Sequence, residues 1–103
     1  MNTLDRIVLD LAVEDRVGAW ELIWRLQSSD IDADEALLRR TVSEMIQRGL
    51  LRAFLLSDRD EILDDQVPLS TVELDEHWLE PSRGDVQLRF EATVAGEEEY
   101  YDQ

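Results

Sequence analysis

The hydrophobic positions in the first half of the chain repeat at the spacing of amphipathic helices. Apolar residues three and four positions apart predict a helix over residues 3–15 and a second over residues 19–27. A third helix is predicted to begin after Asp32, which resembles a capping residue with Glu35 three positions later, and to end at Gly49, a residue that closes helices. The predicted buried stripes are Leu4, Ile7, Val8 and Leu11, then Ala19, Leu22, Ile23 and Leu26, then Leu38, Thr41, Val42, Met45 and Ile46.

The second half of the chain has the pattern of two strands joined by a long charged connection. Residues 50–56 are apolar on both faces except at Arg52, which predicts a strand with one face covered and the other partly covered. Residues 86–92 alternate between apolar and polar side chains, as a half-buried strand does. Residues 57–66, which follow the first strand, form a charged stretch without periodicity.

Two short helices are predicted around the second strand. Ser70 followed by Glu73 is the pattern of a capping box, so a helix is expected over residues 71–78. Thr93 is expected to cap a final helix over residues 94–101. Helices and strands are therefore both expected, and the predicted fold class is α+β.

Size and composition agree with a single domain over residues 1–103. The chain has the length of an ordinary domain, 44% of its residues are hydrophobic, and no internal repeat or linker interrupts it. Cysteine is absent, which excludes disulfides, thiolate catalysis and cysteine-ligated metal sites. The first residues have no basic stretch followed by an apolar run, and no apolar segment approaches the ~20 residues that span a bilayer, so a cytoplasmic protein is expected.

The chain is strongly acidic. It has 25 Asp and Glu residues against 10 basic residues, and a net charge of −15. This charge repels nucleic acids and anionic membranes, so no membrane partner is expected. All the basic residues are Arg, and a GC-rich codon bias is the favoured explanation. Adaptation to concentrated salt is the alternative explanation of the acidic composition.

Two segments resemble a family of bacterial regulators. The run LRRTVSEMIQRGLL at residues 38–51 resembles the recognition helix and first strand of multiple-antibiotic-resistance-type regulators, and FEATVAGEEEY at residues 90–100 resembles their closing strand, Thr-x-x-Gly and short helix. The resemblance implies a winged helix–turn–helix with three N-terminal helices, a small antiparallel β-wing and a short C-terminal helix. In this chain the wing is long, about 29 residues between the strands, and carries a short extra helix.

The resemblance also implies a DNA-reading face on the third helix. In DNA-binding members this helix enters the major groove, and a basic wing, here residues 57–66, contacts phosphate. The residues that would face the bases are Glu35, Ala36, Arg39, Arg40 and Ser43.

The distribution of charge departs from that of a DNA-binding protein. Residues 31–56 have no net charge, whereas residues 57–103 carry 15 acidic and three basic side chains, a net −12. Because a protein gains affinity for DNA by neutralising phosphates, an acidic wing forfeits that gain. DNA is therefore disfavoured as the partner, and Arg39 and Arg40 are interpreted as a solvated face that offsets nearby acids.

Tryptophans and wing carboxylates are the candidate surface for a protein partner. Trp is frequent at the energetic centres of interfaces, and a cluster of carboxylates attracts a basic protein. Trp20 is expected at the edge of the core. The predicted surface comprises Trp24, Asp58, Asp60, Glu61, Asp64, Asp65 and Trp78. The carboxylate spacing does not match a calcium-binding loop, and no catalytic, cofactor or metal site is predicted.

These patterns favour a non-enzymatic, small acidic winged-helix module that binds a basic protein. An inhibitor, an immunity-type protein or a DNA mimic that masks a nucleic-acid-handling target would have these properties. The alternative is a DNA-binding transcriptional regulator of winged-helix type, expected as a homodimer, that uses Arg39, Arg40 and Ser43. A scaffold subunit of a constitutive complex is the third hypothesis.

Overall fold

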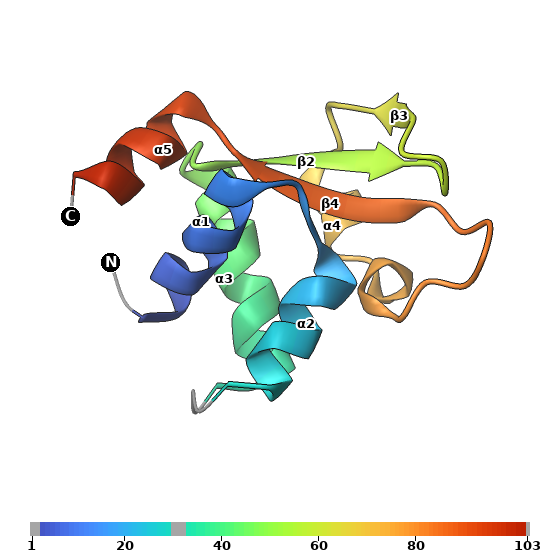
Figure 1. Ribbon diagram of the computed structural model, residues 1–103, viewed down its shortest axis with the longest axis horizontal. Coiled ribbons are helices and arrows are strands. Elements are labelled where there is room, and N and C mark those ends of the chain that lie inside the picture. Colours follow the sequence, from blue (N-terminus) through green and yellow to red (C-terminus); the bar gives the residue numbers. More distant parts are fainter. Residues whose placement is uncertain (1–2, 30–32, 103) are drawn as a thin grey trace.

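A computed structural model describes residues 3–29 and 33–102, which form a mixture of helices and strands (Figure 1). In chain order the elements are α1 (Thr3–Glu14), β1 (Val17–Gly18), α2 (Ala19–Gln27), α3 (Glu35–Gln47), β2 (Leu51–Leu56), β3 (Ile62–Asp64), α4 (Leu69–Val72), the 3₁₀ helix η1 (Asp75–Trp78), β4 (Gln87–Ala92) and α5 (Val94–Tyr101). No helix in the described ranges is long and apolar enough to cross a bilayer. The expected α+β class is confirmed.

The four strands form one antiparallel sheet in the order β1–β4–β2–β3. Strand β4 is central, because Phe90 pairs with Val17 of β1 on one side and with Ala53 of β2 on the other. Strand β3 pairs with the end of β2 across an irregularity between Leu55 and Leu56. Strands β2 and β4 begin within one residue of the predicted positions.

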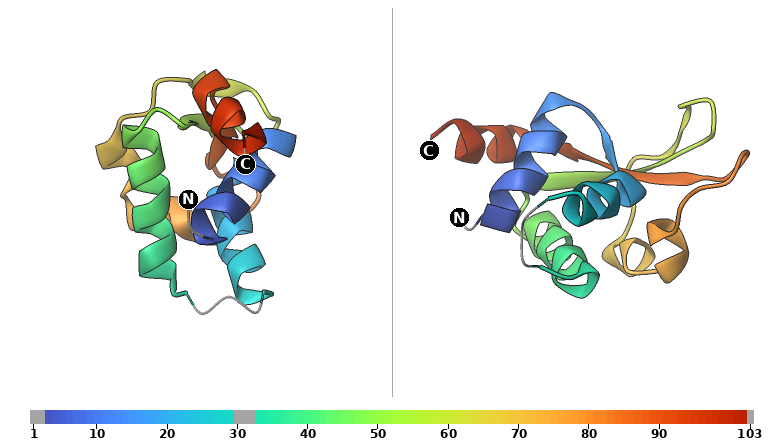
Figure 2. Two further views of the ribbon diagram at one scale, coloured as in Figure 1. Left: turned by 90° about the vertical axis from the view of Figure 1, so that its left-hand side faces the viewer. Right: turned by 60° about the horizontal axis from the view of Figure 1, so that its bottom comes forward.

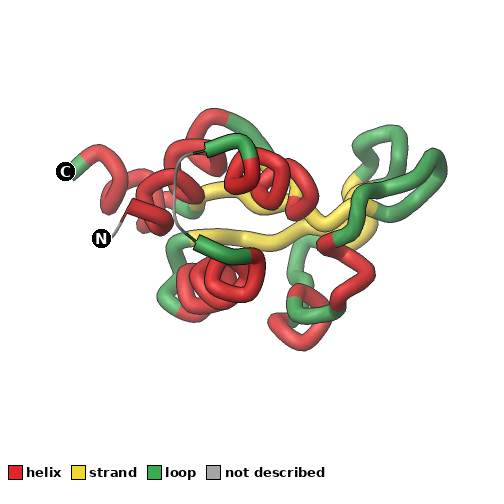
Figure 3. The backbone as a smooth tube through the Cα atoms, turned by 90° about the horizontal axis from the view of Figure 1, so that it is seen from below, coloured by secondary structure: helices red, strands yellow, loops and turns green. Residues whose placement is uncertain are grey.

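Helices α1, α2, α3 and the α4–η1 segment (residues 68–78) cover one face of the sheet (Figures 1 and 2). Helix α5 lies beside α1, at the end of the molecule that holds both termini. The loops that follow β2 and precede β4 lie at the opposite end (Figures 1 and 3). Side chains buried between helices and sheet include Leu4, Val8, Leu9, Leu22, Leu38, Val42, Met45, Val72, Trp78, Leu88 and Phe90.

The start of α3 differs from the predicted one. Asp34 is the capping residue, because its carboxylate accepts a hydrogen bond from the Leu37 N–H at 2.8 Å, and the helix begins at Glu35. The predicted cap, Asp32, lies outside the described residues. The predicted end is confirmed, since Gly49 has a positive φ of 77°.

The buried face of α1 is rotated from the predicted stripe. Leu4 and Val8 are buried as expected, whereas Ile7 and Leu11 are only half-buried. Leu9 and Ala12 are buried in their place. The reason is that α1 contacts α3, α5 and β4, so its buried face points between these three elements.

Strands β1 and β3 are absent from the predicted pattern. The two residues of β1 are too few to show alternation, and the strand exists because it pairs with β4. Strand β3 lies within residues 57–66, named here the acidic hairpin. The Ser57 N–H donates to the Glu61 carbonyl at 2.9 Å and Asp60 has a φ of 63°, so the chain reverses and brings β3 onto β2.

The single helix predicted over residues 71–78 is wrong. Helix α4 begins earlier, after Pro68, and without the predicted side-chain cap. The chain then becomes extended at Leu74 before η1 begins. This break turns the indole of Trp78 inward, where its Nε1 donates to the Val72 carbonyl at 2.8 Å.

Candidate functional site

The α4–η1 segment lies against α3 and holds Arg39, one of the predicted DNA-reading residues. The Arg39 guanidinium donates to the Glu73 carbonyl at 2.7 Å and pairs with the Asp75 carboxylate at 2.8 Å. It also lies over the Trp78 ring, 5.5 Å from the centroid, and 3.9 Å from the Glu35 carboxylate. Only 25% of its side chain is exposed. Arg39 therefore serves the internal packing of the protein.

The other predicted DNA-reading residues have different surroundings, and Glu35 and Ala36 are exposed at the start of α3. Arg40 is exposed and has no hydrogen bond or ion pair with any residue that the structure describes. Ser43 is half-buried. Arg39, Arg40 and Ser43 line a cavity of about 350 Å³ whose other wall includes Glu73 and Trp78. The outward face of α3 is therefore partly covered by the α4–η1 segment.

The structure separates the two tryptophans of the predicted partner surface. Trp24 is 52% exposed on α2, with the Arg25 guanidinium 5.5 Å from its ring centroid, so its predicted exposure is confirmed. The prediction for Trp78 is wrong: it is 2% exposed and packs on Phe90 at a centroid distance of 5.8 Å. Trp20 is partly buried against the core, as expected.

The predicted carboxylates are gathered on the acidic hairpin. Asp58, Asp60, Glu61 and Asp65 are exposed, whereas Asp64 is half-buried and accepts a hydrogen bond from the Gln66 N–H at 2.9 Å. Two apolar residues of β3, Ile62 and Leu63, are also exposed between these acids. Within the described ranges, no group of three or more His, Asp or Glu side chains is arranged to hold a metal ion.

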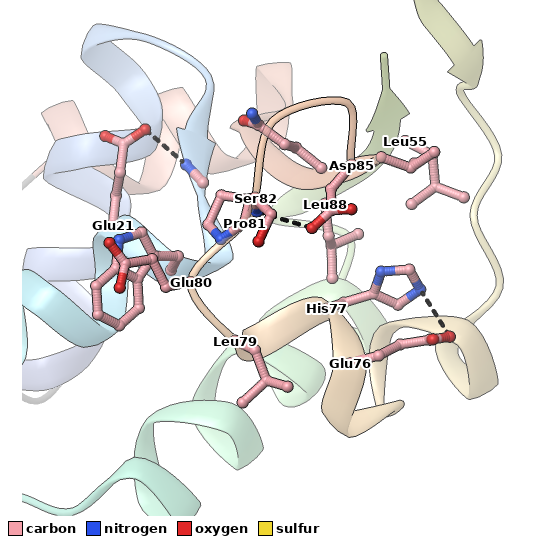
Figure 4. Close-up of a pocket in the computed structure, with 14 residues that line it drawn as sticks. Glu21, Leu55, Glu76, His77, Leu79, Glu80, Pro81, Ser82, Asp85 and Leu88 are labelled. Carbon is pink, nitrogen blue, oxygen red and sulfur yellow. Dashed lines mark hydrogen bonds and ion pairs between the residues drawn. The ribbon is translucent and has the colours of Figure 1, made fainter. Parts of the chain in front are cut away.

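A second cavity, which the sequence patterns do not predict, opens between α2, η1 and the loop that precedes β4. It has a volume of about 840 Å³ (Figure 4). Its apolar lining consists of Trp20, Leu55, Leu79, Pro81, Val86 and Leu88, and its acidic lining of Glu21, Glu76, Glu80 and Asp85. These residues come from distant parts of the chain, so no local motif identifies them. The nearest sequence signal is the apolar pair Leu79 and Val86, which flanks a polar turn.

The acids around this cavity are held to different degrees. The Glu21 carboxylate lies 3.6 Å from the Arg89 guanidinium and 3.4 Å from the Gly18 N–H. Asp85 accepts a hydrogen bond from the Ser82 N–H at 2.7 Å. Glu80, in contrast, has no hydrogen bond or ion pair to the described part of the chain.

Three arginines lie around Phe54 of β2, and one of them, Arg89, also reaches Glu21 of α2. The guanidinium groups of Arg16 and Arg52 each lie 5.1 Å from the centroid of the buried Phe54 ring. Arg16 also pairs with Glu91 at 3.2 Å, and Arg89 donates to the Arg16 carbonyl at 3.2 Å. Three of the ten arginines thus lie together around Phe54 and Glu91, where β2 and β4 pair.

Helices α1 and α5 are joined by a hydrogen bond from the Tyr100 hydroxyl to the Asp10 carboxylate. This bond is the main cause that raises the pKa of Tyr100 above its ordinary value, and desolvation contributes in the same direction. The Tyr100 hydroxyl must keep its proton to donate this hydrogen bond. The bond holds α5 against α1.

Comparison with protein-family models, with curated proteins and with solved structures finds no match to this chain.

Proposed function

We propose that the chain is a non-enzymatic, winged-helix-like module that binds a basic protein, as an inhibitor or immunity-type protein would when it masks a nucleic-acid-handling target. The order of elements supports the winged-helix part of the proposal: three helices, with the short β1 after the first, precede β2, the acidic hairpin, the α4–η1 segment, the returning strand β4 and the terminal helix α5. The resemblance of residues 38–51 and 90–100 to multiple-antibiotic-resistance-type regulators supports the same fold.

The observation that carries the proposal is the contact between Arg39 and the α4–η1 segment. A base-reading Arg must present its donors to the edge of a guanine. Here the donors of Arg39 are directed to the Glu73 carbonyl and the Asp75 carboxylate, and Glu73 lines the same cavity as Arg40. Entry of α3 into a major groove would require the α4–η1 segment to move and its acids to approach phosphates.

The charge of the acidic hairpin indicates that the partner is basic. In a DNA-binding wing, basic side chains contact phosphate, whereas this hairpin has five carboxylates and one Arg. A basic protein meets such a surface with favourable long-range attraction, which accelerates association. The exposed Ile62 and Leu63 supply apolar area between the charges.

Carbodiimide coupling tests this proposal with unusual selectivity. The reagent joins a carboxylate to an amine, and the chain has no Lys, so every side-chain amine in a product comes from the partner. We expect nuclease-treated extracts of the producing cells to yield a basic protein linked through Asp58, Glu61 or Asp65. Neutralising the hairpin removes the reactive carboxylates themselves, so this variant is judged by its association rate, which should fall about tenfold. The test variant is Asp58→Asn, Asp60→Asn, Glu61→Gln and Asp65→Asn.

A matched control removes four charges from the far end of the molecule. It neutralises carboxylates of α5 and its C-cap and should leave the links and the association rate unchanged. The control variant is Glu97→Gln, Glu98→Gln, Glu99→Gln and Asp102→Asn. Links confined to α5, or a preparation that yields no partner, would contradict the proposal.

The alternative function, DNA-binding regulation, is supported by the exposed Arg40 on α3. It predicts that fluorescence anisotropy of labelled promoter DNA rises at low salt when the protein is added, and that Arg40→Ala abolishes the rise. The protein-binding proposal predicts no anisotropy change. A rise that Arg40→Ala removes would decide for the regulator.

A further inference from the structure

We infer that the cavity between α2, η1 and the loop before β4 is the anchoring site for a basic–apolar segment of the partner, in which an Arg or Lys lies next to an aliphatic residue. This inference rests on the proposed function, because it names the part of the basic partner that is bound and where. The residues that form the site are Trp20, Glu76, Leu79, Glu80, Val86 and Leu88.

The floor of this cavity is apolar and fixed by the sheet. Leu55 and Leu88 are directly paired between β2 and β4, and Leu88 is buried. Trp20 packs against the core from α2. At the mouth, Leu79 is 67% exposed and Val86 is exposed as well. An apolar surface of this kind, open on one side and bordered by polar groups, is typical of a binding site.

The charges around the cavity select a cation. Four carboxylates line it, no Arg or Lys does, and its one histidine, His77, lies 4.0 Å from Glu76 (Figure 4). Glu21 is partly neutralised by Arg89, but Glu80 has no partner among the described residues. An Arg or Lys side chain matches this combination, because its methylene stem covers apolar surface while its charged end reaches the acids. An acidic segment would be repelled.

The wall formed by residues 79–86 is already ordered. The Ser82 N–H donates to the Asp85 carboxylate at 2.7 Å, and the Asp85 N–H donates to the Ser82 carbonyl at 3.0 Å. Gly84 completes the turn with a φ of 88°. A wall held in this way does not have to be ordered when the partner binds, which favours affinity.

The test is an NMR titration of the ¹⁵N-labelled protein with the peptide acetyl-Leu-Arg-Ala-Leu-Arg-amide. We expect shift changes in the Trp20 indole and in the amides of Leu79, Glu80 and Val86. The same peptide with Glu in place of Arg should cause none. Glu76→Lys with Glu80→Lys should weaken the affinity about tenfold or more, since like charges then meet.

The matched control, Glu97→Lys with Glu98→Lys, makes the same charge change on α5 and should bind the peptide with unchanged affinity. Shift changes confined to residues 57–66 would overturn the anchoring site while leaving the proposed function intact, because the basic peptide would still bind the acidic surface. Absence of shift changes, or equal binding of the Glu peptide, would also overturn it. Failure of the proposed function would be seen in a different experiment, as carbodiimide coupling that yields no partner protein.

Discussion

Arg39 and Arg40 are adjacent on α3, and their different surroundings determine what each side chain does. Arg39 bonds to the Glu73 carbonyl, pairs with Asp75 and lies over Trp78. Arg40 extends into solvent. Two identical side chains therefore have different effects: one stabilises the contact between α3 and the α4–η1 segment, and the other is available to an external ligand.

Arg39→Ala should lower the free energy of unfolding by about 1–2 kcal/mol. Most of the loss comes from the hydrogen bond to Glu73 and the packing on Trp78, because an ion pair to the largely exposed Asp75 contributes little. Urea denaturation followed by tryptophan fluorescence measures the change. Arg40→Ala is the matched control, with an expected change within about 0.5 kcal/mol. Equal effects of the two substitutions would contradict the assigned role of Arg39.

At the scale of elements, the start of α5 is fixed to the end of α3. The Thr93 N–H donates to the Leu50 carbonyl at 3.0 Å, and the Thr93 hydroxyl donates to the Gly49 carbonyl at 2.6 Å. Gly96 lies against the same Leu50 carbonyl, where a Cβ would come within 2.1 Å of the oxygen. The Thr-x-x-Gly pattern is thus explained by a close approach between two backbones.

Gly96→Ala should lower the free energy of unfolding by about 1–3 kcal/mol, the usual cost of forcing an extra methyl into a packed site. Helix propensity alone predicts the opposite, since Ala is favoured over Gly in a helix by about 1 kcal/mol. Thermal unfolding followed by circular dichroism gives the sign. The control is Ala95→Ser, at an exposed position of the same helix. A stabilised Gly96→Ala variant would contradict the close approach.

The elements that can be predicted from sequence are those whose signals are local. Helix α2 shows helical periodicity, Gly49 ends α3, and Thr93 caps α5, so these elements occur where the pattern places them. Strands β1 and β3 depend on pairing with distant strands. No periodicity in residues 57–66 identifies β3, and two residues of β1 are too short to have any.

The candidate site was predictable only in part, for a related reason. The acidic hairpin is contiguous in sequence, so its carboxylates are gathered wherever the hairpin lies. Trp78 is buried because the chain becomes extended at Leu74, a change that local propensity does not predict. The cavity beside η1 combines α2, both long strands and the loop before β4, so only the tertiary fold assembles it.

At the scale of the whole molecule, carboxylates are gathered on particular surfaces. Arg16 and Arg52 lie over Phe54 with Glu91 beside them, and Arg89 joins the Arg16 carbonyl to Glu21 of α2. Carboxylates occupy the acidic hairpin, the rim of the cavity and α5. Much of the net charge of −15 therefore lies on surfaces where acids have few cations beside them, and their mutual repulsion opposes the compact state.

Screening by salt should therefore stabilise the fold. Raising NaCl from 0.02 to 0.5 M should increase the midpoint of thermal unfolding by about 4–8 °C, the shift that ~1 kcal/mol produces in a domain of this size. Calorimetry measures the midpoint, and the hairpin-neutralised variant should respond less. The rise should level off as the Debye length falls to about 3 Å near 1 M salt. Continued steep stabilisation above 1 M would indicate adaptation to concentrated salt, and a fall in the midpoint would contradict the repulsion.

The position of β4 between β1 and β2 has a consequence for synthesis on the ribosome. About 30 residues separate the end of β2 from the start of β4. At ordinary translation rates, β4 is therefore synthesised about 2–6 s after β2. During that interval the edge of β2 that pairs with β4 is open, and an open apolar strand edge of this kind associates with other nascent chains. The carboxylates of residues 58–65 emerge directly behind it and repel such encounters. We therefore expect the acidic hairpin to oppose aggregation of the growing chain before the fold exists.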